Sequence, residues 1–132
     1  MNEVLSFLKE KSPTFYLATM EGDQPRVRPF GAVCACEGKL YLITNKKKKV
    51  YAQIEKNPKV ELSGMDAEGT WLRVAATLVL DDTPGPQAKM LEDYPNLKGR
   101  YEVGDPTMAV LCMKDAIATF ESFTTEPKTV TF

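Results

Sequence analysis

Four consecutive lysines, Lys46 to Lys49, stand between an alternating apolar run, 40–45, and a short helical pattern, 50–56. A helix N-terminus carries unpaired backbone N–H groups and partial positive charge, which together favour an anion such as phosphate. Lysines placed there add charge-assisted hydrogen bonds, each contributing about 1.5–3 kcal/mol when well formed. The run predicts a phosphate site, and a solvated basic turn is the plain alternative.

A second cationic pattern lies on a predicted strand, 26–36. Alternate residues of a strand share a face, so Arg26, Arg28 and Phe30 are expected to point the same way. Guanidinium groups bind phosphate through paired donors and stack on rings, so this face suits a flat, anionic ligand. A solvent-facing strand is the alternative, more so for Arg26 than for Arg28, which is deeper in the strand.

Trp71 and Arg73 share one face of another predicted strand, 71–81, and the apolar residues of that strand lie on the opposite face. A dimer interface or an aromatic ligand would explain a tryptophan on a polar face. Packing against the surface of the same chain would explain it equally well. Both readings stay open from the sequence.

The cysteines do not form a plausible metal site. Cys34 and Cys36 share a strand face, but Cys112 is the only further cysteine and the chain has no histidine. We expect all three to be small buried residues. The missing histidine also removes the commonest general base, and there is no GxGxxG or P-loop motif, so redox chemistry would need a borrowed cofactor.

Length and net charge further restrict the classes of protein to which this chain can belong. The 132 residues, 43% of them hydrophobic, predict one domain over 1–132 with a real core. A net charge of −1 argues against nucleic acid as a partner and favours a small anion at the lysine run. No apolar stretch is long enough for a membrane helix, and no signal peptide is recognisable. We expect a cytoplasmic protein, in agreement with three cysteines.

The elements that must position these residues are mostly strands. Apolar periodicity and turn residues predict, in order, helix 2–11, strands 14–20, 26–36 and 39–45, helix 48–56, strands 60–65 and 71–81, helix 87–94, and strands 108–114 and 116–122. Short turns join the first three strands, which predicts an antiparallel meander. The fold class is mainly β, a partly open barrel of six to seven mostly antiparallel strands with small helices. The connection Tyr94 to Pro106 is the expected cover of a cleft.

Taken in order, these segments resemble the pyridoxamine 5′-phosphate oxidase-like family of FMN-binding split β-barrels. The matching segments are FYLAT at 15–19, GDQPRVRPFG at 22–31, GKLYLITN at 38–45, NPKV at 57–60 and WLR at 71–73, with a basic pair inside the lysine run. The likeness spans nearly the whole chain and rests on the order and spacing of the segments. It implies a homodimer with two FMN molecules in clefts between the subunits.

The resemblance also implies which residues surround FMN. With Arg26 from the strand pattern, the candidate set is Arg26, Arg28, Pro29, Phe30, Thr44, Asn45, Lys48, Lys49, Gln53, Trp71 and Arg73. Lys48 and Lys49 would hold the phosphate, although the choice of two among four lysines is open by one position. Trp71 and Arg73 would reach the cleft from the partner subunit.

The implied activity is transfer of a hydride from NAD(P)H to FMN and of electrons to a small acceptor. The chain lacks the later arginine and histidine with which pyridoxamine-phosphate oxidases hold substrate, so vitamin B6 oxidation is not expected. Val74 to Ala76 also stands where many relatives have a glycine. Three alternatives remain: a flavin store or redox sensor without turnover, a deazaflavin or haem pocket in the same fold, and a lysine-rich module that binds nucleic acid or protein. No motif identifies the acceptor.

Overall fold

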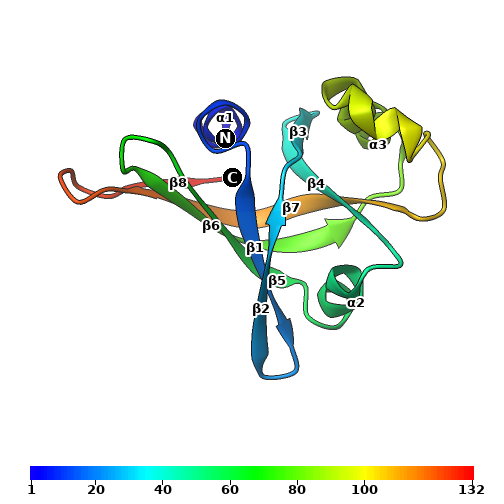
Figure 1. Ribbon diagram of the computed structural model, residues 1–132, viewed down its shortest axis with the longest axis horizontal. Helices are drawn as coiled ribbons and strands as arrows, with labels where there is room; N and C mark the ends of the chain where they lie inside the picture. The colour runs from blue at the N-terminus through cyan, green and yellow to red at the C-terminus, as the bar shows by residue number, and fades with distance from the viewer.

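A computed structural model describes residues 1–132, and one large antiparallel sheet dominates it (Figure 1). The helices and strands, in chain order, are α1 (Asn2–Ser6), the π-helical turn η1 (Phe7–Lys11), β1 (Phe15–Glu21), β2 (Gln24–Phe30), β3 (Val33–Cys36), β4 (Lys39–Asn45), α2 (Lys49–Lys56), β5 (Lys59–Met65), β6 (Trp71–Leu80), α3 (Pro84–Asp93), the 3-10 helix η2 (Pro95–Gly99), β7 (Met108–Glu121) and β8 (Lys128–Thr131). None of the helices is long and apolar enough to cross a membrane.

The sheet curls into a split β-barrel. Its pairing order is β2-β1-β5-β6-β7-β4-β3, and β8 is added beside β7. β2 and β3 stand at opposite ends of this order, although only Gly31 and Ala32 separate them in the sequence. So short a link spans roughly 11 Å at most, so the two edges of the sheet must approach each other. The predicted fold class is confirmed, with eight strands where the sequence predicts six to seven.

The predicted strand 26–36 is wrong in one respect, because the structure breaks it at Gly31 and Ala32. The first half, β2, pairs with β1, whereas the second half, β3, pairs with β4. The first three predicted strands therefore do not form a meander. Pro25 and Pro29 fit this arrangement, since proline has no N–H for a second neighbour and is confined to edge strands such as β2.

At the C-terminal end the sequence predicts two strands, 108–114 and 116–122, and the structure has one. β7 runs through both segments and bends at Asp115, whose φ of 51° is in the left-handed region. The register against β6 shifts between Ala75 and Thr77, as expected for a β-bulge that bends a long strand. β8, at 128–131, was not predicted, because four residues are too short for a periodic signal.

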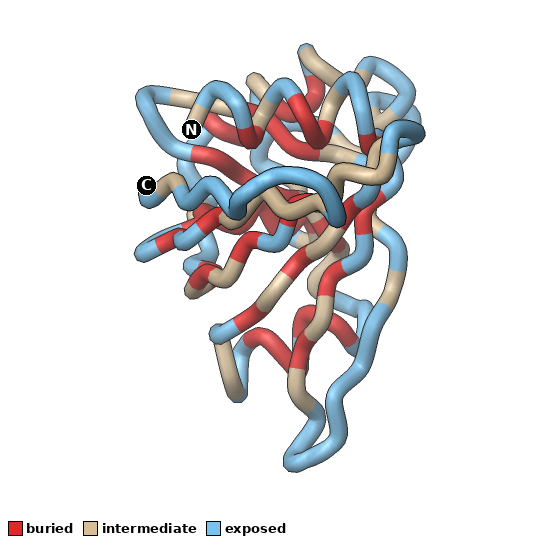
Figure 2. Tube along the Cα trace, turned by 90° about the vertical axis from the view of Figure 1, so that its left-hand side faces the viewer, coloured by how far each residue is buried: buried red, intermediate tan, exposed pale blue.

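Two buried clusters hold the fold together. The larger fills the interior of the curled sheet and includes Phe15, Leu17 and Leu72, and Figure 2 shows the buried positions running along the strands, away from the exposed tip of the β1–β2 hairpin. The smaller lies beneath α3 and includes Cys34 and Cys112. These two cysteines are buried as expected, whereas Cys36 is only half-buried, and all three are unpaired.

Candidate functional site

A cationic hollow of about 570 Å³ opens between the β1–β2 hairpin and α2. It is lined by Glu21, Arg26, Val27, Arg28, Lys48, Lys49, Val50 and Gln53. Four cationic side chains and one carboxylate give this lining a net charge of +3. Five of the predicted cofactor residues therefore meet at one place.

Arg28 is held in this hollow by neutral partners. In the β1–β2 pairing it stands opposite Leu17, on the face of β2 that turns towards the barrel interior. Its Nη1 donates to Thr19 Oγ1 at 2.7 Å and to the Leu17 carbonyl at 3.2 Å, and its Nη2 donates to Gln53 Oε1 at 2.6 Å. Burial lowers the pKa of Arg28, but arginine remains charged at any physiological pH. The Arg28 guanidinium is therefore held in one orientation, and no carboxylate neutralises its charge.

Thr19 and Gln53 form the buried support of Arg28. Thr19 is 2% exposed and Gln53 is 7% exposed, and the Thr19 hydroxyl donates to Gln53 Oε1 at 2.5 Å. The sequence prediction included Gln53 but missed Thr19. A signal was present, since Thr19 is the one polar residue in the alternating buried positions of β1, after Phe15 and Leu17.

Arg26 differs from Arg28 because it already has an anionic partner. Its Nε and Nη2 both donate to Glu21 Oε1, at 3.1 Å and 2.9 Å, and both side chains are exposed. The hydrogen bond from Arg26 lowers the pKa of Glu21, so the carboxylate stays ionised at neutral pH. Arg26 therefore adds less net positive charge to the hollow than its position in the sequence suggests.

The structure separates the four lysines by direction. Lys46 forms an ion pair with Asp82 at 3.2 Å, away from the hollow, and the Lys47 backbone N–H bonds to Asn45 Oδ1 at 2.8 Å. Lys48 has extended backbone geometry at the N-terminal cap of α2, and Lys49 is the first residue of that helix. Both line the cationic hollow, and neither has a carboxylate within 4.0 Å. Of the four lysines, Lys48 and Lys49 are therefore the two that line the hollow without a carboxylate partner.

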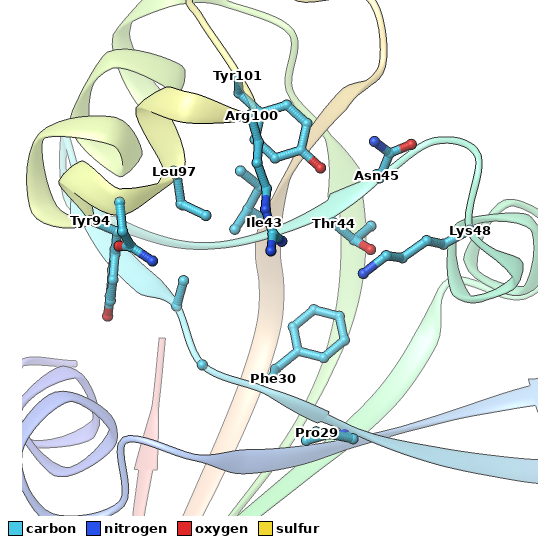
Figure 3. A pocket seen from close by; sticks show the side chains of 13 residues that line it. Pro29, Phe30, Ile43, Thr44, Asn45, Lys48, Tyr94, Leu97, Arg100 and Tyr101 are labelled. Atoms are coloured by element: carbon cyan, nitrogen blue, oxygen red, sulfur yellow. The ribbon is translucent and has the colours of Figure 1, made fainter.

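A second pocket, of about 280 Å³ and with more hydrophobic residues in its lining, adjoins the hollow (Figure 3). Its lining consists of Pro29, Phe30, Gly31, Ala32, Ile43, Thr44, Asn45, Lys48, Tyr94, Asn96, Leu97, Arg100 and Tyr101. β2 and β4 supply one side, and the segment from the end of α3 through η2 supplies the other. We call this space the aromatic pocket, because Phe30, Tyr94 and Tyr101 line it. Lys48 lines both the pocket and the hollow, and Arg28 of the hollow precedes Pro29 of the pocket. One elongated ligand can therefore occupy both.

The connection Tyr94 to Pro106 was expected to cover a cleft; its first part, 94–101, lines this pocket, but no residue in it was singled out. Tyr94 ties it to the barrel edge: its hydroxyl accepts from the Val33 N–H at 3.1 Å and donates to the Val33 carbonyl at 3.2 Å. Lys9 lies over the Tyr94 ring, 5.4 Å from its centre. The available signal was the group Lys98, Arg100 and Tyr101 between Pro95 and Pro106.

Trp71 and Arg73 lie elsewhere in the chain, in and beside a third hollow on the outer face of the sheet. Trp71 Nε1 donates to Glu121 Oε2 at 3.1 Å, and its ring lies 5.1 Å from that of Phe123. Arg73 forms ion pairs with Glu61 at 2.9 Å and with Glu121 at 3.6 Å. The hydrogen bond with Glu61 raises the pKa of Arg73. Within one chain these two residues are not brought to the other site residues.

Comparisons with known proteins bear on the whole chain. The family model described as pyridoxamine 5′-phosphate oxidase matches residues 1–116. The chain is 46% identical to a NimC/NimA family protein from Clostridium acetobutylicum, with a TM-score of 0.95 over 100% of this chain and 92% of that one.

More distant structures share the fold alone. General Stress Protein 26 from Bacillus anthracis has 18% identity and a TM-score of 0.70, covering 98% of this chain and 97% of that one. A heme binding protein from Mycobacterium smegmatis has 12% identity and a TM-score of 0.71, covering 92% of this chain and 53% of that one. No match was found among the curated proteins.

Proposed function

Because the chain belongs to the pyridoxamine 5′-phosphate oxidase family, we propose that it is a flavoprotein that binds FMN and acts as an NAD(P)H-dependent oxidoreductase on a small acceptor. Residues 1–132 would form one FMN-binding domain. One observation carries this proposal: the cationic hollow and the aromatic pocket adjoin, and Lys48 lines both. FMN has the matching form, a phosphate joined by a short chain to a flat ring.

The residues fit FMN by their chemistry. Arg28, Lys48 and Lys49 offer three positive charges without a carboxylate partner, which suits a phosphate dianion. Pro29 and Phe30, with Thr44 and Asn45 across the pocket, would line the ring. Arg26 and Gln53 complete the phosphate side, Gln53 by orienting Arg28.

When bound, FMN supplies acceptance of a hydride from NAD(P)H and delivery of its two electrons, with protons from solvent, to the acceptor. The pocket lining contains no carboxylate, and the chain has no histidine. The lining therefore lacks imidazole and carboxylate, the side-chain groups that most often act as general acid or base. The residues would bind, orient and exclude water, and the net positive charge of the hollow would favour negative charge developing on the bound FMN.

We also propose a homodimer, because the outer face of the sheet exposes several large apolar side chains. Strand pairing places Val27, Tyr16, Met65 and Ile117 on this face, and each of them is at least 51% exposed. Trp71 lies among them. An exposed apolar sheet face of this kind is typical of a surface that a protein partner covers. Covering it with a second copy would bring Trp71 and Arg73 near the partner subunit's cofactor.

Light scattering of the FMN-loaded protein tests the dimer. The wild type is expected at twice the monomer mass of 14.7 kDa. Replacing Met65 and Ile117 together by lysine would place charge on the covered face, outside the cationic hollow, and yield a monomer. Val103→Lys is the control, since Val103 is equally exposed but lies in the loop before β7. A monomeric wild type at micromolar concentration contradicts the dimer.

Absorption spectroscopy tests the cofactor. Purified protein is titrated with FMN, with deazaflavin and with haemin, and micromolar or tighter affinity for FMN alone is expected. Failure of FMN to bind at tens of micromolar, or preferential binding of haemin, sinks the FMN proposal. A nucleic-acid or protein-binding module would show neither flavin nor haem binding.

Anaerobic mixing with NADH and NADPH tests turnover. Bleaching of the oxidised flavin band within seconds is expected of a reductase, whereas a stable band over many minutes indicates a flavin store or sensor.

A cytoplasmic location belongs to the same proposal, because Cys34, Cys36 and Cys112 are all unpaired thiols.

A further inference from the structure

Arg100 is an arginine of the aromatic pocket that the proposed FMN site does not use. It follows η2, and its side chain runs towards the space above Phe30 (Figure 3). Its backbone N–H bonds to the Leu97 carbonyl at 2.9 Å, which fixes the turn from which the side chain projects. The guanidinium itself has no hydrogen-bond or ion-pair partner in the structure.

The electrostatics of the pocket call for an anion. Lys48 and Arg100 extend into the space from opposite sides, and the thirteen lining residues include no aspartate or glutamate (Figure 3). Arg100 is exposed, so water screens its charge, but no carboxylate neutralises either cation and an anion in the space would be attracted to both. Arg73 shows the contrast, since carboxylates neutralise it where it lies.

The phosphate of FMN does not account for Arg100. Arg28, Lys48 and Lys49 already gather at the N-terminus of α2. Arg100 instead comes from the opposite side, together with Tyr94, Leu97 and Tyr101. This side offers two aromatic rings, one aliphatic side chain and a guanidinium fork, which together suit a planar molecule with a carboxylate.

We propose that Arg100 recognises the carboxylate of a planar, aromatic or conjugated acid, which is the acceptor of the proposed oxidoreductase. Tyr94 and Tyr101 form the walls along which the flat part of the acceptor lies. The role of the bound acid as electron acceptor rests on the proposed function. The recognition of its carboxylate by Arg100 does not, because it is a binding property. It can be measured with or without FMN.

The test uses benzoate and the neutral, isosteric benzamide as probes. Each is titrated into FMN-loaded protein by the change in flavin absorbance, and into FMN-free protein by NMR shifts of the segment 94–101. The wild type is expected to bind benzoate about tenfold more tightly than benzamide, as one exposed charge-assisted contact permits. Arg100→Gln is expected to abolish this preference and to leave benzamide binding unchanged.

Two variants sharpen the result. Arg100→Lys retains a point charge without the paired donors and is expected to keep only part of the preference. Lys98→Gln is the matched control, because Lys98 is an exposed cation on η2 that does not line the pocket. It should bind both probes as the wild type does.

Other outcomes overturn the proposal. Arg100→Gln that retains the benzoate preference, or a wild type without one, shows that Arg100 does not read a carboxylate. A loss of FMN affinity in Arg100→Gln assigns the residue to the flavin, and a loss confined to the KM for NADPH assigns it to the nucleotide phosphate. If the wild type binds benzoate but never FMN, the proposed function fails and the anion site stands.

Discussion

Arg28 and Arg73 have similar neighbours in the sequence but different hydrogen-bond and ion-pair partners in the structure. Each lies on a strand beside an aromatic residue, and both were predicted to bind the same cofactor. Arg28 is held by a hydroxyl, an amide and a carbonyl oxygen, all neutral, whereas Arg73 is neutralised by Glu61 and Glu121. A fixed arginine without a counter-charge retains attraction for an anion, so the partners of an arginine are more informative than its strand position.

The largest expected effect tests this difference directly. Arg28→Ala should weaken FMN binding roughly 100-fold, as loss of a charged contact of about 2.7 kcal/mol does. Thr19 still satisfies Gln53 in this variant, so the fold is expected to persist. Arg73→Ala should weaken binding less than about tenfold, because carboxylates already share its charge. Equal losses in FMN titrations would show that Arg73 acts in the partner's site as fully as Arg28.

The lysine run allows the same comparison over short distances. Lys48→Ala and Lys49→Ala should each weaken FMN binding about tenfold, since both line the cationic hollow without a carboxylate partner. Lys46→Ala is the matched control, because Lys46 is engaged with Asp82. Fluorescence titration of FMN distinguishes the three variants. A tenfold loss in Lys46→Ala alone would show that the phosphate binds Lys46 in place of Lys48 and Lys49.

A smaller effect is expected at the support of Arg28. Thr19→Val removes a buried hydroxyl that accepts from Arg28 and donates to Gln53. The unfolding free energy should fall by about 1–3 kcal/mol, and FMN affinity should fall about threefold as Arg28 becomes less well oriented. Thr19→Ser retains the hydroxyl and should restore both quantities. Restoration of stability without affinity would show that Thr19 does not position Arg28.

Most of the fold followed from local patterns in the sequence. Alternating apolar residues identified β1, β4, β5 and β6 within one or two residues, and the start of α2 was placed within one residue. The break at Gly31 and Ala32 was not predictable in this way. It depends on two edges of one sheet meeting in space, which no short-range periodicity encodes.

The candidate site was predictable in composition but not in its electrostatics. The sequence identified Lys48 and Lys49 as cations at the start of a helix and Arg28 as a cation within a strand. It did not show that Glu21 would neutralise Arg26, since that pair forms across the β1–β2 hairpin. Arg100 was missed for a related reason: its connection has no periodicity, and only the folded chain brings it opposite Lys48.

The smallest expected effect concerns Asp93, a carboxylate that forms ion pairs with Lys9 and Lys89, whereas the hollow gathers cations. Burial of Asp93 would raise its pKa, but hydrogen bonds from Lys9 and Lys89 outweigh this and lower it below the ordinary 3.8. A lowered folded pKa stabilises the protein above the unfolded pKa, and this contribution is lost as pH falls through the folded value. Asp93→Asn should therefore destabilise the protein by on the order of 1 kcal/mol at pH 7 and approach the wild type in strong acid. Urea unfolding at several pH values measures the difference, with the exposed Glu92→Gln as control. A difference that persists at low pH, where both side chains are uncharged, would mean that the ion pairs of Asp93 with Lys9 and Lys89 are not the source of the stabilisation.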